Sequence, residues 1–266
     1  MDRWEGAAVK EAKKLYISVV SHSQEDLIAH YYGEFPKKAG SYEIVLSILD
    51  NTGSSQLRRL CEESGYVYYH DGEQRGFGSN HNRMFEYLSP RDEDIFVIAN
   101  PDLKIEPEQL AGMLERFECS EADLFTVKMY LDKASGRLDF PDRYFPGILN
   151  FPISILTWKR LHYGRRERVE NPEWISGAFI LFKPEAYRRL GGFDEGFFMY
   201  CEDIDLCYRA RRMGLSLVMD PDHYVEHDSR MESRTLFSKN LYWHITSTLR
   251  YLRKNRIFKL LTIAKT

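Results

Sequence analysis

Short apolar runs alternate with amphipathic stretches along the first part of the chain. Four of the runs are rich in β-branched and aromatic residues and predict buried strands at residues 15–20, 43–49, 66–69 and 94–99. Helical compositions lie between them, at about residues 24–35 and 55–64, and from the end of a loop at 76–80 to about residue 88. Because parallel neighbours need crossover helices, this alternation predicts an α/β fold with a Rossmann-like, mostly parallel central sheet flanked by helices.

The pattern is less regular after residue 102. It predicts strands at 124–130, 174–182 and 215–219, and helices at 107–117, 184–190, 201–213 and 236–263. The stretch 132–172 is rich in Pro, Gly, Tyr and Arg. A stretch of that length inside a compact domain usually has a function, so we expect a lid or an acceptor loop there.

Polar residues follow the predicted strands at the points where they end. In doubly wound sheets, ligands bind beyond the carboxyl ends of the strands. Those ends carry Ser21, Asp50 with Asn51, Asp71, and the sequence Asn100-Pro101-Asp102. The pattern therefore predicts a nucleotide site on this edge of the sheet.

Composition narrows the class of protein. The 266 residues are 43% hydrophobic, which suits a packed core, and no window resembles a membrane span. The first 14 residues lack the apolar region of a secretory signal, so a cytoplasmic location is expected. A net charge of −3 does not favour nucleic acid, and the four cysteines show no spacing typical of zinc sites or disulfide frameworks.

Asp102 is the first candidate for chemistry. Pro101 fixes its own backbone and biases Asn100 toward an extended conformation, which holds the carboxylate at the exit of the strand. A carboxylate there can bind Mg²⁺ or Mn²⁺ together with diphosphate oxygens. The alternative is an ordinary turn that precedes the next helix.

Three acids in the predicted helix 201–213 are the second candidate. Glu202, Asp203 and Asp205 follow an apolar, aromatic run at residues 197–200. Acids in a first helical turn commonly favour the helix dipole, which explains one or two of the three. Glu202 and Asp205 share a helix face and Asp203 points elsewhere, so at least one acid is expected to face a cavity and act as a general base.

Two weaker signals remain open. The glycines of residues 76–82 resemble a phosphate-binding loop, but they match neither the dinucleotide pattern nor the Lys-bearing P-loop, which argues against NAD-dependent and P-loop chemistry. His227 follows the last strand-like segment. A single histidine is more often structural than a metal ligand.

The C-terminal region 230–266 contains nine Lys and Arg residues against one acid, Glu232, interleaved with aromatic residues. This pattern is typical of a solvated amphipathic helix. It also suits a helix that lies on an anionic membrane surface.

These motifs, in this order, resemble the family 2 glycosyltransferases of GT-A fold, and among them the bacterial rhamnosyltransferases of O-antigen (lipopolysaccharide) and cell-wall polysaccharide biosynthesis. The resemblance extends over about residues 15–256. Its most specific part is the run 191–209. The supporting matches are Asp50-Asn51 with Ser54, Gly76-Phe77-Gly78 with Asn82, Asn100-Pro101-Asp102, and residues 174–178.

The resemblance implies a role for each matching residue. Asp203 would be the catalytic base, and Asp102, the last residue of the family's Asp-x-Asp motif, would hold the metal and diphosphate with His227. The first acid of that motif is here Asn100, a weaker ligand. Further donor-site residues would be Ser21, Asp50, Asn51, Gly76, Phe77, Gly78 and Asn82. Acceptor-site residues would be Trp174, Ser176, Gly177 and Glu202.

The expected reaction is an inverting transfer of L-rhamnose from dTDP-β-L-rhamnose to a polyprenyl-diphosphate-linked saccharide with a GlcNAc acceptor, with Mg²⁺ or Mn²⁺ as cofactor, on the inner face of the plasma membrane. The alternatives are a UDP-sugar donor or a non-catalytic nucleotide-sugar-binding scaffold. The expected organisation is an extension (1–14), a nucleotide-sugar-binding half (15–130), an acceptor-binding and catalytic half (131–228) and basic helices (229–266).

Overall fold

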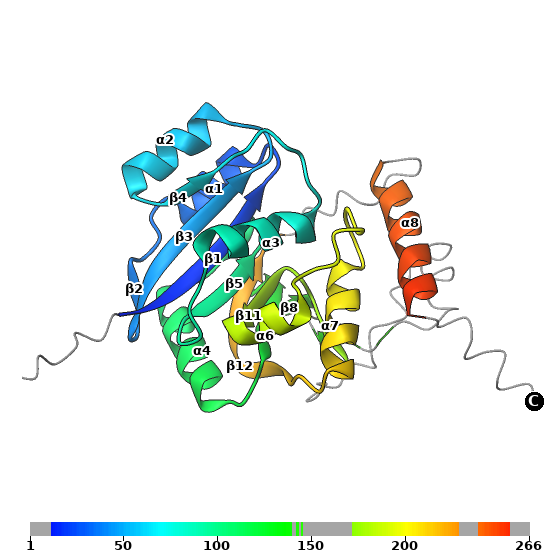
Figure 1. Ribbon diagram of the computed structural model, residues 1–266. Helices are drawn as coiled ribbons and strands as arrows, with labels where there is room; N and C mark the ends of the chain where they lie inside the picture. Colours follow the sequence, from blue (N-terminus) through cyan, green and yellow to red (C-terminus); the bar gives the residue numbers. More distant parts are fainter. Residues whose placement is uncertain (1–11, 140–141, 144, 146–171, 229–238, 256–266) are drawn as a thin grey trace, which may run out of the picture.

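A computed structural model describes residues 12–139, 142–143, 145, 172–228 and 239–255 (Figure 1). The helices are α1 (Glu25–Tyr32), α2 (Ser55–Ser64), α3 (Phe77–Leu88), α4 (Pro107–Cys119), α6 (Pro184–Leu190), α7 (Glu202–Arg212) and α8 (Lys239–Lys254). The strands are β1 (Lys13–Ser21), β2 (Lys38–Ala39), β3 (Tyr42–Asp50), β4 (Val67–Tyr69), β5 (Ile95–Ala99), β6 (Leu103–Lys104), β7 (Leu124–Asp132), β8 (Arg137–Asp139), β9 (Asp142–Arg143), β10 (Trp174–Ile175), β11 (Phe179–Phe182) and β12 (Leu217–His227).

The first half of the sheet is the parallel block that the apolar runs predict. β1 lies between β3 and β5 and is parallel to both, and β4 extends the block beyond β3. The strands are apolar along nearly their whole length because helices cover both faces of the sheet. The carboxyl ends of β1 and β3 meet directly, with Ser21 opposite Asp50.

The second half of the sheet is mixed. β11 is antiparallel to both β5 and β7, and it is inserted between them in the order β5-β11-β7-β12-β6. The expected strand 174–182 is wrong as one element: it is interrupted at residues 176–178, and β10 pairs with β9 instead. The expected strand 215–219 is too short, because a bulge between Asp220 and Tyr224 lets β12 continue past Pro221 to His227.

Other boundaries differ less. The expected loop 76–80 is mostly the first turn of α3, which begins at Phe77. Within the stretch 132–172, residues 137–139 and 142–143 form short strands, and most of the expected lid lies outside the described residues. The expected helix 236–263 is described as α8, from Lys239 to Lys254.

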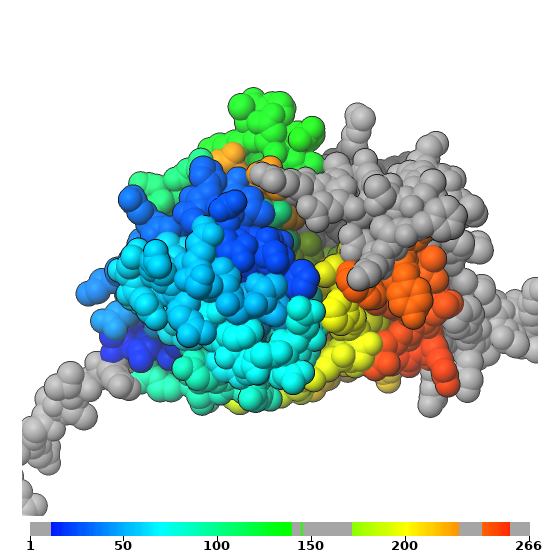
Figure 2. Space-filling view, turned by 90° about the horizontal axis from the view of Figure 1, so that it is seen from above, coloured from blue at the N-terminus to red at the C-terminus, as the bar shows by residue number. Residues whose placement is uncertain are grey.

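Two hydrophobic cores lie on opposite faces of the sheet. One joins β1, β3 and β5 to α1 and α4, and the other joins the sheet to α3, α6 and α7. Figure 1 shows α8 beside α7, on the side of α7 away from the sheet. Seen from above in Figure 2, the orange and red atoms of α8 lie next to the yellow atoms of the region that includes α7.

Candidate active site

The Asn100-Pro101-Asp102 turn is fixed by its backbone from three sides. The Asn100 N–H donates to Ala178 O at 2.9 Å, which joins the turn to the gap between β10 and β11. The Tyr32 hydroxyl in α1 donates to Asn100 O at 2.8 Å. The Asp228 N–H donates to Asp102 O at 2.9 Å. The carboxylate of Asp102 therefore sits on a rigid support at the carboxyl edge of the sheet.

His227 lies against this turn, as the family resemblance implied. Its Nε2 is 3.3 Å from Asp102 Oδ1 and 3.4 Å from the side-chain amide of Asn100. Its Nδ1 is 3.4 Å from Asp139 Oδ2. Burial lowers the pKa of His227, but the carboxylates of Asp102 and Asp139 outweigh burial and raise it to about 9.

The side chains at this turn fit a weakly held divalent cation. Asp102 Oδ1 is buried and has no hydrogen-bond partner, and it converges with an imidazole nitrogen and an amide. The described residues contain no cluster of three or more His, Cys, Asp or Glu side chains that could hold a metal. Mg²⁺ and Mn²⁺ accept such a partial set when substrate phosphates and water complete the shell.

A strained segment leads into α7. Tyr200 and Cys201 have φ values of 70° and 65°, a conformation that costs about 1–3 kcal/mol for each non-glycine residue. Phe198 O accepts a hydrogen bond from the Phe77 N–H at 3.0 Å, and Met199 O accepts one from the Ser247 hydroxyl at 2.7 Å. Contacts from α3 and α8 thus hold the strained turn and set where α7 begins.

Asp203 lies in the first turn of α7 and is only partly buried. Its Oδ2 accepts from the Gly177 N–H at 3.1 Å, and its Oδ1 accepts from the Ile204 N–H at 2.8 Å. A Cβ at position 177 would be 3.3 Å from Asp203 Cβ and 3.4 Å from the Phe77 ring. Glycine therefore allows the close approach that orients this carboxylate.

Glu202 has a different environment from its neighbour. It is 7% exposed, and its Oε2 has no hydrogen-bond partner. Burial and the charge of Asp203 raise the pKa of Glu202 to about 8. The two adjacent carboxyl groups therefore differ, with Glu202 mostly protonated near neutral pH.

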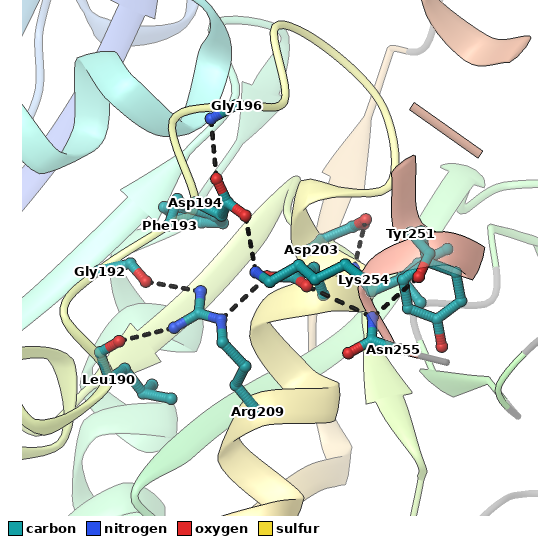
Figure 3. Close-up of polar contacts among 12 residues, drawn as sticks. Leu190, Gly192, Phe193, Asp194, Gly196, Asp203, Arg209, Tyr251, Lys254 and Asn255 are labelled. Carbon is teal, nitrogen blue, oxygen red and sulfur yellow. Dashed lines mark hydrogen bonds and ion pairs between the residues drawn. The ribbon is translucent and has the colours of Figure 1, made fainter. Parts of the chain in front are cut away.

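Asp205, the third acid, is fully buried and structural. It pairs with Arg209 Nε at 2.9 Å and with Lys254 Nζ of α8 at 2.8 Å. Arg209 also donates to the carbonyls of Leu190 and Gly192, and Lys254 also pairs with Asp194 (Figure 3). This network anchors α7 to the preceding loop and to α8.

Asp50 and Asn51, two of the predicted donor-site residues, organise turns. The Asp50 carboxylate accepts hydrogen bonds from Thr52, Ser54 and Tyr68. Burial raises the pKa of Asp50, but these hydrogen bonds outweigh it and lower the pKa below the ordinary range. Asn51 donates to and accepts from the Arg75 backbone at 3.3 Å each. Contact of either residue with the nucleotide base of the donor stays a prediction.

Gly76, Gly78 and Asn82 hold α3 against the segment before α7. A Cβ at position 76 would be 2.2 Å from Phe198 O, and one at position 78 would be 2.5 Å from Phe193 Cβ. The Asn82 amide makes four hydrogen bonds within 3.2 Å, to the Tyr187 hydroxyl, to the Phe193 N–H and carbonyl, and to Glu195. These contacts occupy the Asn82 amide, and its role in donor binding stays a prediction.

Seven of the predicted site residues form two groups that one segment connects. Asn100, Asp102 and His227 form the first group. Phe77, Gly177, Glu202 and Asp203 form the second. Ser21 lies with Asp50 and Asn51 at the edge of the sheet, and Trp174 is 2% exposed. Ser176 precedes Gly177 and accepts from the Ala178 N–H at 3.4 Å.

Sequence reasoning missed Tyr32 and Asp139. Both reach the first group from distant elements, α1 and β8. A single sequence contains no signal for such contacts, because they depend on how the strands are ordered in the sheet.

Comparison with known proteins identifies the family. The family model "Glycosyltransferase like family 2" matches residues 39–246. The rhamnosyltransferase WbbL of Escherichia coli K12 is 31% identical over 250 residues, covering 91% of this chain and 94% of that protein. The chain belongs to this family of glycosyltransferases. An N-acetylglucosaminyl-diphospho-decaprenol L-rhamnosyltransferase of Mycobacterium tuberculosis is 27% identical, covering 68% of this chain and 64% of that protein.

Solved structures show that this glycosyltransferase has the GT-A fold. A mannosyltransferase from Pyrobaculum calidifontis, in complex with GDP-Man and Mn²⁺, matches with a TM-score of 0.57 and 16% identity, covering 84% of this chain and 59% of that one. TarS of S. aureus, in complex with UDP-GlcNAc, matches with a TM-score of 0.56 and 15% identity, covering 85% and 62%.

The raised pKa of Glu202 should lower the free energy of unfolding of the glycosyltransferase as pH rises. The folded state holds the proton up to about pH 8 and the unfolded state releases it near 4.5, so unfolding becomes easier across that window. Within this window, release of this one proton lowers the free energy of unfolding by about 1.4 kcal/mol per pH unit. Glu202→Gln removes it, so melting temperatures of the variant and wild type should diverge in the variant's favour from about pH 5 to about pH 8. The exposed Glu185→Gln is the control, and parallel profiles for Glu202→Gln would contradict the assignment.

Proposed function

We propose that this glycosyltransferase transfers L-rhamnose from dTDP-β-L-rhamnose to a hydroxyl of a polyprenyl-diphosphate-linked saccharide, with GlcNAc as the acceptor sugar, in the assembly of O-antigen or a related polysaccharide. The observation that carries the reaction class is Asp203, a partly exposed carboxylate held by the Gly177 N–H. The rhamnosyl specificity rests on the similarity to two rhamnosyltransferases.

Asp203 is the general base in this proposal. It takes the proton of the acceptor hydroxyl while that oxygen attacks the anomeric carbon from the face opposite the diphosphate, which inverts the configuration. Glu202 does not compete for the proton because burial keeps it protonated. It lies next to Asp203, where a protonated carboxyl can donate a hydrogen bond to the acceptor.

Asp102, His227 and the Asn100 amide would hold Mg²⁺ or Mn²⁺ with the donor diphosphate. A divalent cation bound there neutralises the charge that develops on the leaving nucleotide. Two proteins with a similar fold, the mannosyltransferase and GalNAc-T7, were solved with Mn²⁺. Metal binding should be weak without donor, because the described residues supply so few ligands.

Each part of the chain has its own function in this proposal. Residues 15–130 would bind the nucleotide sugar through the carboxyl edge of the parallel block, and residues 131–228 would supply the base and the acceptor site. Ser176 and Gly177 would face the acceptor, and Trp174, which is buried in the core, would support them from behind. Residues 1–14 would be an extension outside this division.

A UDP-sugar donor is the second candidate. A protein of the same fold was solved with UDP-GlcNAc. The choice between the nucleobases of the two donors depends on the shape of the pocket rather than on residue type alone.

A donor screen tests the proposal. The enzyme is incubated with a short-chain lipid-linked GlcNAc acceptor and, in separate reactions, dTDP-rhamnose, UDP-galactose and UDP-GlcNAc, and the product is weighed by mass spectrometry. We expect a product heavier by one deoxyhexose with dTDP-rhamnose, at a rate at least about 100-fold above that with either UDP-sugar, since a missed polar contact in a donor pocket costs that much or more. A product only with a UDP-sugar would favour the second candidate, and we expect dTDP to raise the melting temperature more than UDP.

The exposed face of α8 is proposed to dock on the anionic inner face of the plasma membrane. Tyr242, Ile245 and Leu249 are 66%, 40% and 56% exposed and lie on one side of the helix, near the exposed Arg253. The opposite side packs against α7 and its preceding loop through Ser247 and other residues. No described helix is long and apolar enough to cross a bilayer. An exposed apolar stripe beside basic residues suits an interfacial helix, and a lipid-linked acceptor explains its use.

Vesicle binding tests this face of α8. Tyr242→Asp with Leu249→Asp should lower partitioning onto vesicles of about 30% anionic lipid by tenfold or more, because it removes apolar contact and adds repelled charge. Tyr87→Asp with Met213→Asp is the matched control, since these residues are 57% and 43% exposed on other elements. Equal partitioning of the two double variants would contradict the docking of α8.

A further inference from the structure

The His227 ring lies between two carboxylates, Asp102 in the turn before β6 and Asp139 at the end of β8. Nε2 faces Asp102 Oδ1 at 3.3 Å, and Nδ1 faces Asp139 Oδ2 at 3.4 Å. The ring is 8% exposed and Asp139 is 9% exposed. Each ring nitrogen of His227 therefore faces a carboxylate of its own at ion-pair distance, and Nδ1 has no other hydrogen-bond partner among the described residues.

Strand pairing brings Asp139 to this position. Met129 in β7 pairs with Asp139 of β8 on one side and with Val225 of β12 on the other. His227 is two residues beyond Val225 and points to the same face of the sheet. Asp139 therefore approaches His227 across β7, from the side opposite to Asp102 and its turn.

A histidine that binds a metal through Nε2 must be neutral and must carry its proton on Nδ1. A carboxylate that accepts the Nδ1 proton fixes this tautomer, fixes the ring plane and makes Nε2 a better ligand. Asp139 is placed for this task, and Nε2 points at the two other candidate ligands, Asp102 and Asn100.

We propose that Asp139 is a positioning residue for the cation site: it accepts the Nδ1 proton of His227 and directs Nε2 toward the cation that Asp102 holds. This proposal rests on the metal-dependent reaction proposed above. It assigns a role to a residue outside the motifs of the family resemblance, on the strand β8 within the stretch 132–172 where a lid or an acceptor loop was expected.

A purely structural role is the competing explanation, in which Asp139 only ties β8 to β12. A second Asp–His pair in the same strand, Asp220 with His223, serves as the control for a structural role. Asp220 is 1% exposed and lies 2.6 Å from His223 Nδ1 in the bulge of the same strand, β12, and the His223 ring packs against Gly112 of α4. Asp220→Asn disturbs an Asp–His pair with a buried carboxylate and a partly exposed histidine, without touching the cation site.

The experiment measures Mn²⁺ binding to the full chain in the presence of dTDP, by the electron paramagnetic resonance signal of free Mn²⁺. We expect Asp139→Asn to weaken Mn²⁺ binding by about 10–100-fold, as for other carboxylates that orient a metal-binding histidine. Asp220→Asn should bind Mn²⁺ as the wild type does, even where its melting temperature falls. Mn²⁺ binding by Asp139→Asn equal to that of the wild type would overturn the role of Asp139 and leave the proposed metal site intact.

Two further outcomes keep the proposal testable. If the wild type binds no Mn²⁺ with either dTDP or UDP, the metal site and the role of Asp139 both fail, while donor transfer can still be scored separately. If Asp139→Asn does not fold, imidazole ¹⁵N NMR of the wild type with Mg²⁺ and dTDP decides the question. We expect the His227 proton on Nδ1, and a proton on Nε2 would overturn the proposal.

Discussion

A short backbone segment, residues 176–178, determines how the two halves of the candidate active site lie relative to each other. Its Ala178 carbonyl accepts from the N–H of Asn100 at 2.9 Å, and its Gly177 N–H donates to Asp203 at 3.1 Å. Residues 176–178 lie between β10 and β11 and belong to neither strand. Their backbone N–H and carbonyl groups are therefore available for Asn100 and Asp203 instead of pairing with a neighbouring strand. The turn proposed to bind the metal and the proposed base are thus positioned by main-chain contacts, which leave little freedom for either.

The three acids in the first turn of α7 carry the same functional group in three different environments. Glu202 is buried without a partner for Oε2 and keeps its proton, Asp203 is partly exposed and accepts two N–H groups, and Asp205 is buried in ion pairs. One turn of helix therefore supplies a neutral acid, a candidate base and a structural anchor. The anchor extends to α8, so the helix proposed to contact lipid is joined directly to the helix that carries the base (Figure 3).

Features determined by local sequence could be predicted. The bounds of α2 agree with the sequence expectation because Ser54 caps its start and Gly65, with φ 70°, ends it. The direction of β11 could not be predicted, since four apolar residues form either a parallel or an antiparallel strand equally well. The expected strand ended at residue 219, whereas a bulge lets β12 continue past Pro221 to His227. The family resemblance singled out Asp203 among the three acids, and its role as the base stays a prediction. Asp139 depends on strand order, and Asn82 makes four contacts that its motif does not reveal.

The most direct test of the account is the turnover of Asp203→Asn, measured by the mass of the product formed with the best donor and a lipid-linked GlcNAc. Asparagine can still accept the Gly177 N–H through its side-chain oxygen, so the melting temperature should change little. The account predicts a fall in turnover of about 10²–10⁴, the contribution of a general base. Turnover within about tenfold of the wild type would contradict it, because loss of a general base costs more than that.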